Sequence, residues 1–84
     1  YLSPEQRGQA AAIPRALAAA AGHTRVADIE AAAAAELVGL DVDYAQVRSV
    51  DLGPPEVGES RLLIATRLGS TRLLDNAAVE VRSL

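Results

Sequence analysis

RLLIATRLGSTRLLDN, residues 61–76, is the stretch in which local chemistry decides the fold. Two runs rich in branched apolar residues, 62–68 and 71–74, are separated by Gly69-Ser70. Glycine at the first central position is what a two-residue type II′ turn requires, so the stretch predicts a β-hairpin. The loop length also fixes the expected pairs: Leu68 with Thr71, Arg67 with Arg72, Thr66 with Leu73, Ala65 with Leu74 and Ile64 with Asp75.

Alternation along the two strands predicts two faces that are not equivalent. One face is apolar with a single acid at its end, and it carries Leu62, Ile64, Thr66, Leu68, Leu73 and Asp75. The other face brings arginines together, and it carries Leu63, Ala65, Arg67, Arg72, Leu74 and Asn76, with Arg61 on the same side.

A first helix is expected from Ser3 toward Ala21. Ser3-Pro4-Glu5-Gln6 combines a serine N-cap, a proline in the first turn, an acid and a glutamine three residues after the cap, which together mark a helix start. Pro14 lacks the N–H that would bond to the carbonyl of Ala10, so we expect a kink or a short break there. Gly22 fits the position after the last helical turn.

A second helix is expected over residues 25–38, ending at Gly39. Its alanine run, residues 31–35, favours helix and lets a neighbouring element approach closely. The apolar side is expected to carry Val26, Ile29, Ala33 and Leu37, and the opposite side Glu30 and Glu36.

The spacing of apolar residues along the sequence changes after the second helix. Residues 42–50 interleave β-branched and aromatic residues with polar ones, which predicts a strand. Residues 51–59 hold two prolines and two glycines and are expected to form a loop. The run 77–81 can extend the last hairpin strand or form a further short one. The order predicts an α+β domain, residues 1–84, with two helices packed on a three-stranded, mainly antiparallel sheet.

Composition limits what the chain can do. Its 84 residues include no cysteine, so disulfides and thiolate chemistry are excluded. A net charge of -3, with no lysine in the chain, argues against binding nucleic acid, and no apolar run is long enough for a membrane span. We expect a cytoplasmic protein. A chain that begins with tyrosine is expected to be a piece of a longer one.

The arginines of the hairpin are the first candidate site. Arg67 and Arg72 are expected to lie directly opposite each other, where like charges cost stability unless an anion is near. Arg61 is expected on the same face. Two interpretations follow. In the functional one, the guanidinium groups bind a phosphate or carboxylate. In the structural one, they pair with Asp51, with Glu80 or with the acids of another domain, or they point into water.

The other candidates favour structural roles. Asp75, at the end of an apolar face, is expected to accept hydrogen bonds from backbone amides where the chain bends at Asp75-Asn76. His23 is expected to interact with the last carbonyls of the first helix, since none of the zinc-ligand spacings occurs. Asp41 and Asp43 are typical of a solvated strand edge.

No catalytic, cofactor-binding or metal-binding residue is predicted in this chain. Gly53 and Gly58 belong to no phosphate-binding motif, and neither GxGxxG nor GxxxxGK[ST] occurs. There is also no arrangement of serine, histidine and aspartate to propose as a catalytic triad.

The segments YLSPEQR (1–7), VDYAQVR (42–48) and above all RLLIATRLGSTRLLDN (61–76), together with two alanine-rich helices, resemble the C-terminal domain of the pantothenate synthetase family, also called pantoate-beta-alanine ligase. The resemblance spans nearly the whole chain. Its most specific part is RLLDN, made of Arg72, Leu73, Leu74, Asp75 and Asn76. In the family, the tyrosine and leucine found here as Tyr1 and Leu2 follow immediately after a serine-serine-arginine-asparagine segment. That segment contacts the phosphates of ATP.

The resemblance implies an ATP-dependent ligase that joins pantoate to AMP and passes the pantoyl group to beta-alanine, releasing pantothenate, AMP and pyrophosphate. It implies that ATP and Mg²⁺ bind mainly to a Rossmann-like N-terminal catalytic domain, the partner of this piece, in a homodimeric parent. This chain would be the mobile lid that closes over the nucleotide, inactive alone. The resemblance leaves open whether Arg67, Arg72, Asp75 and Asn76 contact ligand or hold the lid's fold.

Two rival functions follow from the residues alone. One is a stand-alone interaction module, which an exposed apolar strip on the helices or the hairpin would favour. The other is a small anion-binding protein that uses Arg61, Arg67 and Arg72.

Overall fold

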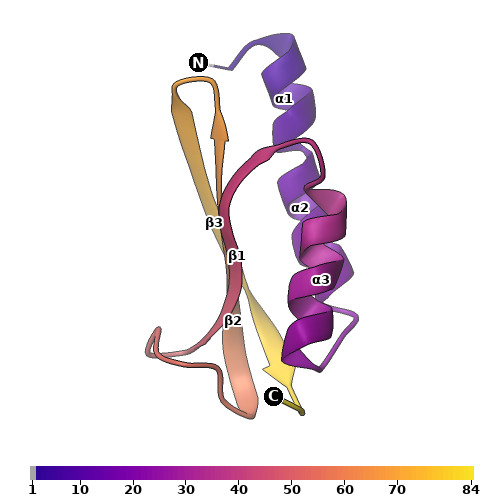
Figure 1. Ribbon diagram of the computed structural model, residues 1–84, viewed down its shortest axis with the longest axis vertical. Helices are drawn as coiled ribbons and strands as arrows, with labels where there is room; N and C mark the ends of the chain where they lie inside the picture. Colours follow the sequence, from indigo (N-terminus) through magenta and orange to yellow (C-terminus); the bar gives the residue numbers. More distant parts are fainter. Residues whose placement is uncertain (1) are drawn as a thin grey trace.

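The computed structural model describes residues 2–84, and predictions that involve Tyr1 lie outside the described residues. Three helical segments lie along one face of a three-stranded sheet (Figure 1). The sheet order is β1-β2-β3 and both pairs of strands are antiparallel. This arrangement confirms the predicted α+β class. The elements are α1 (Pro4–Ala10), α2 (Ala12–Ala20), α3 (Val26–Glu36), β1 (Asp41–Ser49), β2 (Gly58–Leu68) and β3 (Thr71–Val81).

The β2–β3 hairpin has the predicted turn and register. Leu68 pairs with Thr71 and Arg67 with Arg72, and the register continues without a shift to Gly58 and Val81. Gly69 has a φ of 64°, a backbone conformation that glycine adopts without a steric penalty. The run after Asn76 extends β3 to Val81, which was one of the two expected outcomes.

The hydrophobic core fills the space between the helices and the sheet. Residues of β2 that face the helices are buried, whereas Arg67 on the other face is exposed. Helices α2 and α3 approach each other through alanines, and Ala16, Ala20 and Ala33 are fully buried. Because alanine has no side chain beyond Cβ, two helices can pack closely over a narrow sheet. The core consists of Ala12, Ile13, Ala16, Ala20, Ile29, Ala33, Leu37, Val47, Leu62, Ile64, Val79 and Val81.

The first expected helix is divided into α1 and α2, which confirms the break predicted from Pro14. Ser3 caps α1 through a capping box: its Oγ accepts from the N–H of Gln6 at 3.1 Å, and Gln6 Oε1 accepts from the N–H of Ser3 at 2.9 Å. The helix is interrupted at Ala11 and resumes, ending at Ala20. Gly22 follows the helix but does not adopt the left-handed conformation that favours glycine there.

Helix α3 is shorter than expected at both ends and is followed by Gly39, which has a φ of 90°. The prediction for Glu30 was wrong. Its Oε2 accepts a hydrogen bond at 2.9 Å from the backbone N–H of Val47 in β1. Val47 belongs to an edge strand, so its N–H has no partner strand on that side, and the carboxylate of Glu30 accepts its hydrogen bond instead. The helix is thereby attached to the sheet by a polar contact as well as by its apolar side.

The remaining boundaries differ from the predictions by one or two residues. β1 begins and ends one residue early, and β2 begins at Gly58, inside the segment expected to be loop. After β3, the backbone N–H of Arg82 donates to the carbonyl of Thr24 at 2.8 Å, and Val26 donates to Ser83 at 3.1 Å. These bonds attach the C-terminal residues to the start of α3.

The turn glycine generates a stability prediction. A Cβ at Gly69 would lie 2.6 Å from Nε2 of Gln6 and would sit on a backbone with positive φ. Gly69→Ala should therefore lower the free energy of unfolding by about 1 to 2 kcal/mol, measured by urea denaturation. Gly8→Ala is the control, since a Cβ there meets nothing within 4 Å and Gly8 lies inside α1. It should raise stability slightly. Equal effects of the two substitutions would contradict this account of the turn.

Candidate functional site

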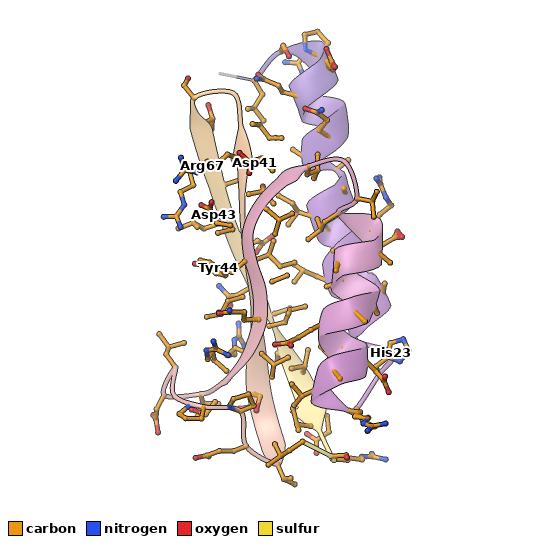
Figure 2. All side chains as sticks on the ribbon, viewed as in Figure 1. His23, Asp41, Asp43, Tyr44 and Arg67 are labelled. Atoms are coloured by element: carbon orange, nitrogen blue, oxygen red, sulfur yellow. The ribbon has the colours of Figure 1, made fainter. Side chains whose placement is uncertain are left out.

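The face of the sheet that no helix covers carries the polar cluster of the molecule. Arg67 and Asp43 lie on this side, away from the helices (Figure 2). Arg67 and Arg72 are direct neighbours in the hairpin register, near the Gly69-Ser70 turn. Their side chains are 59% and 51% exposed, so the two charges are accessible while being held on adjacent strands.

Asp43 lies between the two arginines and binds both. Nε of Arg72 donates to Asp43 Oδ2 at 2.9 Å, and Nε of Arg67 lies 3.3 Å from each carboxylate oxygen. A β-bulge places Asp43 there, because the register of β1 against β2 shifts between Val42 and Tyr44. We call Asp43, Arg67 and Arg72 the hairpin charge cluster. One carboxylate thus screens the repulsion between two guanidinium groups.

The ionisation of Asp43 reflects this position. Partial desolvation of its carboxylate works to raise the pKa, but hydrogen bonds from Arg67 and Arg72, together with their charges, outweigh it and hold the pKa of Asp43 below the ordinary value. Asp43 is therefore ionised at neutral pH, and the cluster carries one net positive charge.

The prediction that Asp51 or Glu80 pairs with the arginines was wrong. The acid that meets Arg67 and Arg72 is Asp43, rather than Asp51 or Glu80. Asp43 was expected to form a solvated strand edge with Asp41. Asp41 lies opposite Arg67 in the register and is exposed, and it forms no ion pair with residues in the described part of the chain.

The other residues of the hairpin motif make separate contacts. Nη2 of Arg61 donates to Oδ1 of Asn76 across the hairpin, so Arg61 is engaged away from the cluster. Asp75 is exposed, and its Oδ1 accepts from the backbone N–H of Asn76 at 2.8 Å, a hydrogen bond of the predicted kind. The predicted bend at these residues was wrong, because β3 continues through them.

Two hollows lie at opposite ends of the sheet. The first, of about 240 Å³, is at the hairpin end and is lined by Arg67, Gly69, Ser70, Thr71 and Arg72. The second, of about 420 Å³, lies beside the loop between β1 and β2 and is lined by Arg48, Leu52, Gly53, Pro54 and Pro55.

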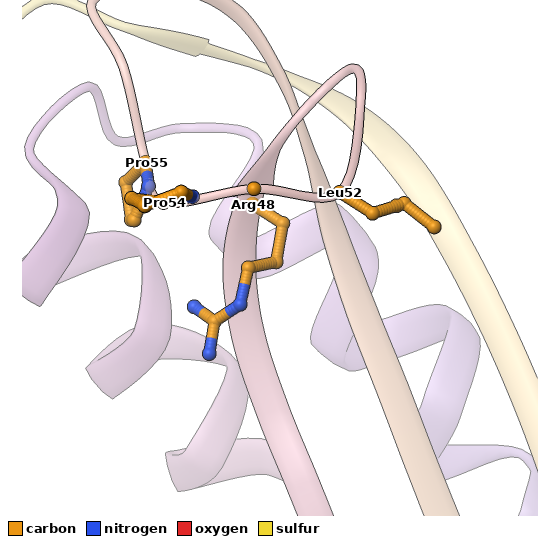
Figure 3. A pocket seen from close by; sticks show the side chains of 5 residues that line it. Arg48, Leu52, Pro54 and Pro55 are labelled. Carbon is orange, nitrogen blue, oxygen red and sulfur yellow. The ribbon is translucent and has the colours of Figure 1, made fainter.

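The second hollow is an open apolar groove (Figure 3). The guanidinium of Arg48 is already engaged, because its nitrogens donate to the carbonyl of Val47 at 2.7 Å and to Gln46 Oε1 at 2.8 Å. Leu52 is 62% exposed and has a φ of 65°, an unusual conformation for a leucine. The groove combines apolar contact with one arginine, two of whose guanidinium nitrogens already donate hydrogen bonds.

The only histidine, His23, lies in the exposed turn between α2 and α3. Its backbone N–H donates to the carbonyl of Ala20 at 3.1 Å, so the contact with the helix end is made by the main chain. Across residues 2–84, no group of three or more His, Asp or Glu side chains is arranged to hold a metal ion. The same residues contain no helix long and apolar enough to cross a membrane.

Sequence reasoning found the two arginines and missed the residue that binds them. The signal for a nearby acid was the expected repulsion at Arg67 and Arg72. The bulge that brings Asp43 into place is a tertiary feature of β1 and has no local marker such as glycine. Gln6 was also missed as a neighbour of the turn, since its side chain lies against Gly69.

Known proteins share the sequence and the fold of this chain. A pantothenate synthetase of Thermus thermophilus of known crystal structure superposes on 92% of this chain with a TM-score of 0.80 and 33% sequence identity, and the match covers 32% of that protein. The curated pantothenate synthetases of Mycolicibacterium vanbaalenii and Nocardia farcinica are 49% and 47% identical over 96% and 94% of this chain. The chain spans only 28% and 27% of their lengths.

The fold is therefore that of an α+β domain found within larger ligases. The family model for pantoate-beta-alanine ligase matches residues 1–78. The chain belongs to the pantoate-beta-alanine ligase family.

The lowered pKa of Asp43 predicts a pH dependence of stability. A carboxylate whose pKa is lower in the folded state stabilises the fold above its unfolded pKa of about 4, and that contribution is lost as the pH falls through the folded value. Wild type should thus exceed Asp43→Asn in free energy of unfolding at pH 7, and the difference should shrink between about pH 5 and pH 2. Urea denaturation at a series of pH values measures it.

Asp41→Asn is the control for this series, because it removes a neighbouring carboxylate that forms no ion pair with the arginines in the described chain. Its pH dependence should follow that of wild type more closely. Parallel curves for wild type and Asp43→Asn would contradict the assigned role of Asp43.

Proposed function

We propose that this chain is the C-terminal lid domain of an ATP-dependent ligase that condenses pantoate with beta-alanine through a pantoyl adenylate. The observation that carries the proposal is the structural match over 92% of the chain to a solved pantothenate synthetase, at 33% identity. Membership of the pantoate-beta-alanine ligase family supports the same reaction.

On this proposal the chemistry is performed outside the chain. The described residues bring together no group of three or more His, Asp or Glu side chains that could hold a metal ion, and the one histidine is exposed. ATP and Mg²⁺ would accordingly bind to a Rossmann-like N-terminal catalytic domain of the same polypeptide, in a cytoplasmic homodimer. The isolated chain would be inactive.

The lid would act as a rigid body. Its core is formed between its own helices and its own sheet, and Glu30 and the C-terminal residues add polar contacts between α3 and the strands. A unit of this kind can rotate over a bound adenylate without internal rearrangement. Excluding water from the adenylate prevents its hydrolysis, which is the benefit that a lid supplies.

The interaction-module alternative receives partial support from one feature. Large exposed apolar side chains gather in the β1–β2 loop, where Val50, Leu52 and Val57 are 53%, 62% and 65% exposed. On the hairpin, Leu74 is 63% exposed. The exposed apolar side chains are thus spread over the β1–β2 loop, the hairpin and the turn after α3, where Val38 is 83% exposed, whereas the lid proposal accounts for a match over 92% of the chain.

A chimera tests the proposed function. The corresponding segment of the Mycolicibacterium smegmatis pantothenate synthetase, which is 48% identical to this chain, would be replaced by residues 1–84. With ATP, pantoate and beta-alanine, the chimera should form pantothenate, whereas the same enzyme truncated before the segment and the isolated chain should not. The measurement is product formation together with AMP release.

The matched control is a chimera that carries Gly8→Ala, where a Cβ meets nothing within 4 Å. It should keep the activity of the unmodified chimera. A folded but inactive wild-type chimera, or pantothenate formation by the isolated chain, would contradict the proposal.

A further inference from the structure

The hairpin end of the sheet holds a small hollow lined by two arginines and the turn. We propose that this hollow binds a small oxyanion, phosphate or carboxylate, between the guanidinium groups of Arg67 and Arg72. The turn residues Gly69, Ser70 and Thr71 complete the lining. Nothing in the hairpin's own packing requires two like charges at directly opposed positions.

The hydrogen-bonding capacity of the arginines supports the site. Each guanidinium has five N–H donors, and the contacts with Asp43 use Nε of Arg67 and of Arg72. In the part of the chain that the structure describes, the terminal nitrogens of both groups make no hydrogen bond. Guanidinium forks match the spacing of oxygens in phosphate and carboxylate, so the remaining donors are suited to a second anion.

The size of the hollow restricts the ligand. At about 240 Å³ it is smaller than the pockets of about 300 to 1,000 Å³ that enclose drug-sized ligands. It can accept an inorganic anion or one terminal group of a larger molecule, but it cannot enclose a whole nucleotide. The two guanidinium groups are half exposed, so the anion reaches them from solvent.

Asp43 acts as the internal anion of the site. Its carboxylate binds both arginines in the absence of ligand and thus holds them in position against their mutual repulsion. It also competes with an incoming anion for the same positive charge. Asp41, opposite Arg67, adds a second negative charge nearby without bonding to the arginines. The account therefore predicts weak binding that tightens when the carboxylate of Asp43 is removed.

The identity of the physiological anion rests on the proposed function. In a ligase that forms an acyl adenylate, the anions available are the phosphates of ATP, released pyrophosphate and the carboxylates of the substrates. The hollow lies at the end of the domain where α1 begins, since Gln6 contacts the turn at Gly69. On the lid proposal this end adjoins the nucleotide-binding domain, so the hairpin would present its arginines to an anion held there.

Binding is measured on the 84-residue chain by NMR, through amide shifts of residues 67–72. The two probes are inorganic pyrophosphate and acetate, added at pH 7 and constant ionic strength set with sodium chloride. Both should shift these amides saturably. Absence of saturable shifts at residues 67–72, at this constant ionic strength, would overturn the proposal.

Matched variants separate a site from general electrostatics. Arg67→Gln and Arg72→Gln should each weaken binding about two- to fivefold, the range expected for an exposed charge pair. Arg48→Gln removes the same charge from the same face and should leave binding unchanged. Asp43→Asn should tighten binding by a similar factor, and more than Asp41→Asn, which changes the net charge equally.

Two results would overturn the site. One is that Arg67→Gln and Arg72→Gln change the affinity for the anion no more than Arg48→Gln does. The other is that Asp43→Asn and Asp41→Asn change that affinity equally. Dispersed amide spectra confirm that each variant is folded. Because these measurements need neither ATP turnover nor a second domain, their failure is distinguishable from failure of the ligase proposal, which the chimera tests.

Discussion

The register of the β2–β3 hairpin is the constraint on which the rest of the structure depends. The two-residue turn at Gly69-Ser70 aligns the strands, and a slip of one residue would move Leu62 and Ile64 from the core to solvent. The same register sets Arg67 against Arg72 on the uncovered face. The fold therefore places two like charges side by side, and the contact with Asp43 relieves the cost. Core packing and surface charge follow from one turn.

The parts of the fold governed by neighbours in sequence were predictable. The hairpin pairs, the capping box at Ser3 and the helix break before Pro14 each depend on residues a few positions apart, and all three are confirmed. The α+β class follows from the order of these elements. What sequence reasoning missed depends on how distant segments align: Asp43 faces the arginines only because β1 contains a bulge, and Glu30 meets Val47 only because α3 lies along β1.

The functional conclusion rests on a different basis from the fold. The two hollows lie beside the hairpin charge cluster and the β1–β2 loop, and across residues 2–84 no group of three or more His, Asp or Glu side chains is arranged to hold a metal ion. Family membership and the match to part of a longer pantothenate synthetase support the proposed reaction. On the lid proposal, the contribution of this chain is closure over a site built elsewhere.

The central physical claim is that Asp43 turns a repulsive pair of arginines into a stable one. The most direct test is the effect of Arg67→Gln on the free energy of unfolding, measured at low salt in wild type and in an Asp43→Asn background. The account predicts a reversal of sign: Arg67→Gln destabilises the wild type, where it removes an ion pair, and stabilises the variant, where it removes repulsion with Arg72. The same sign in both backgrounds would contradict the account.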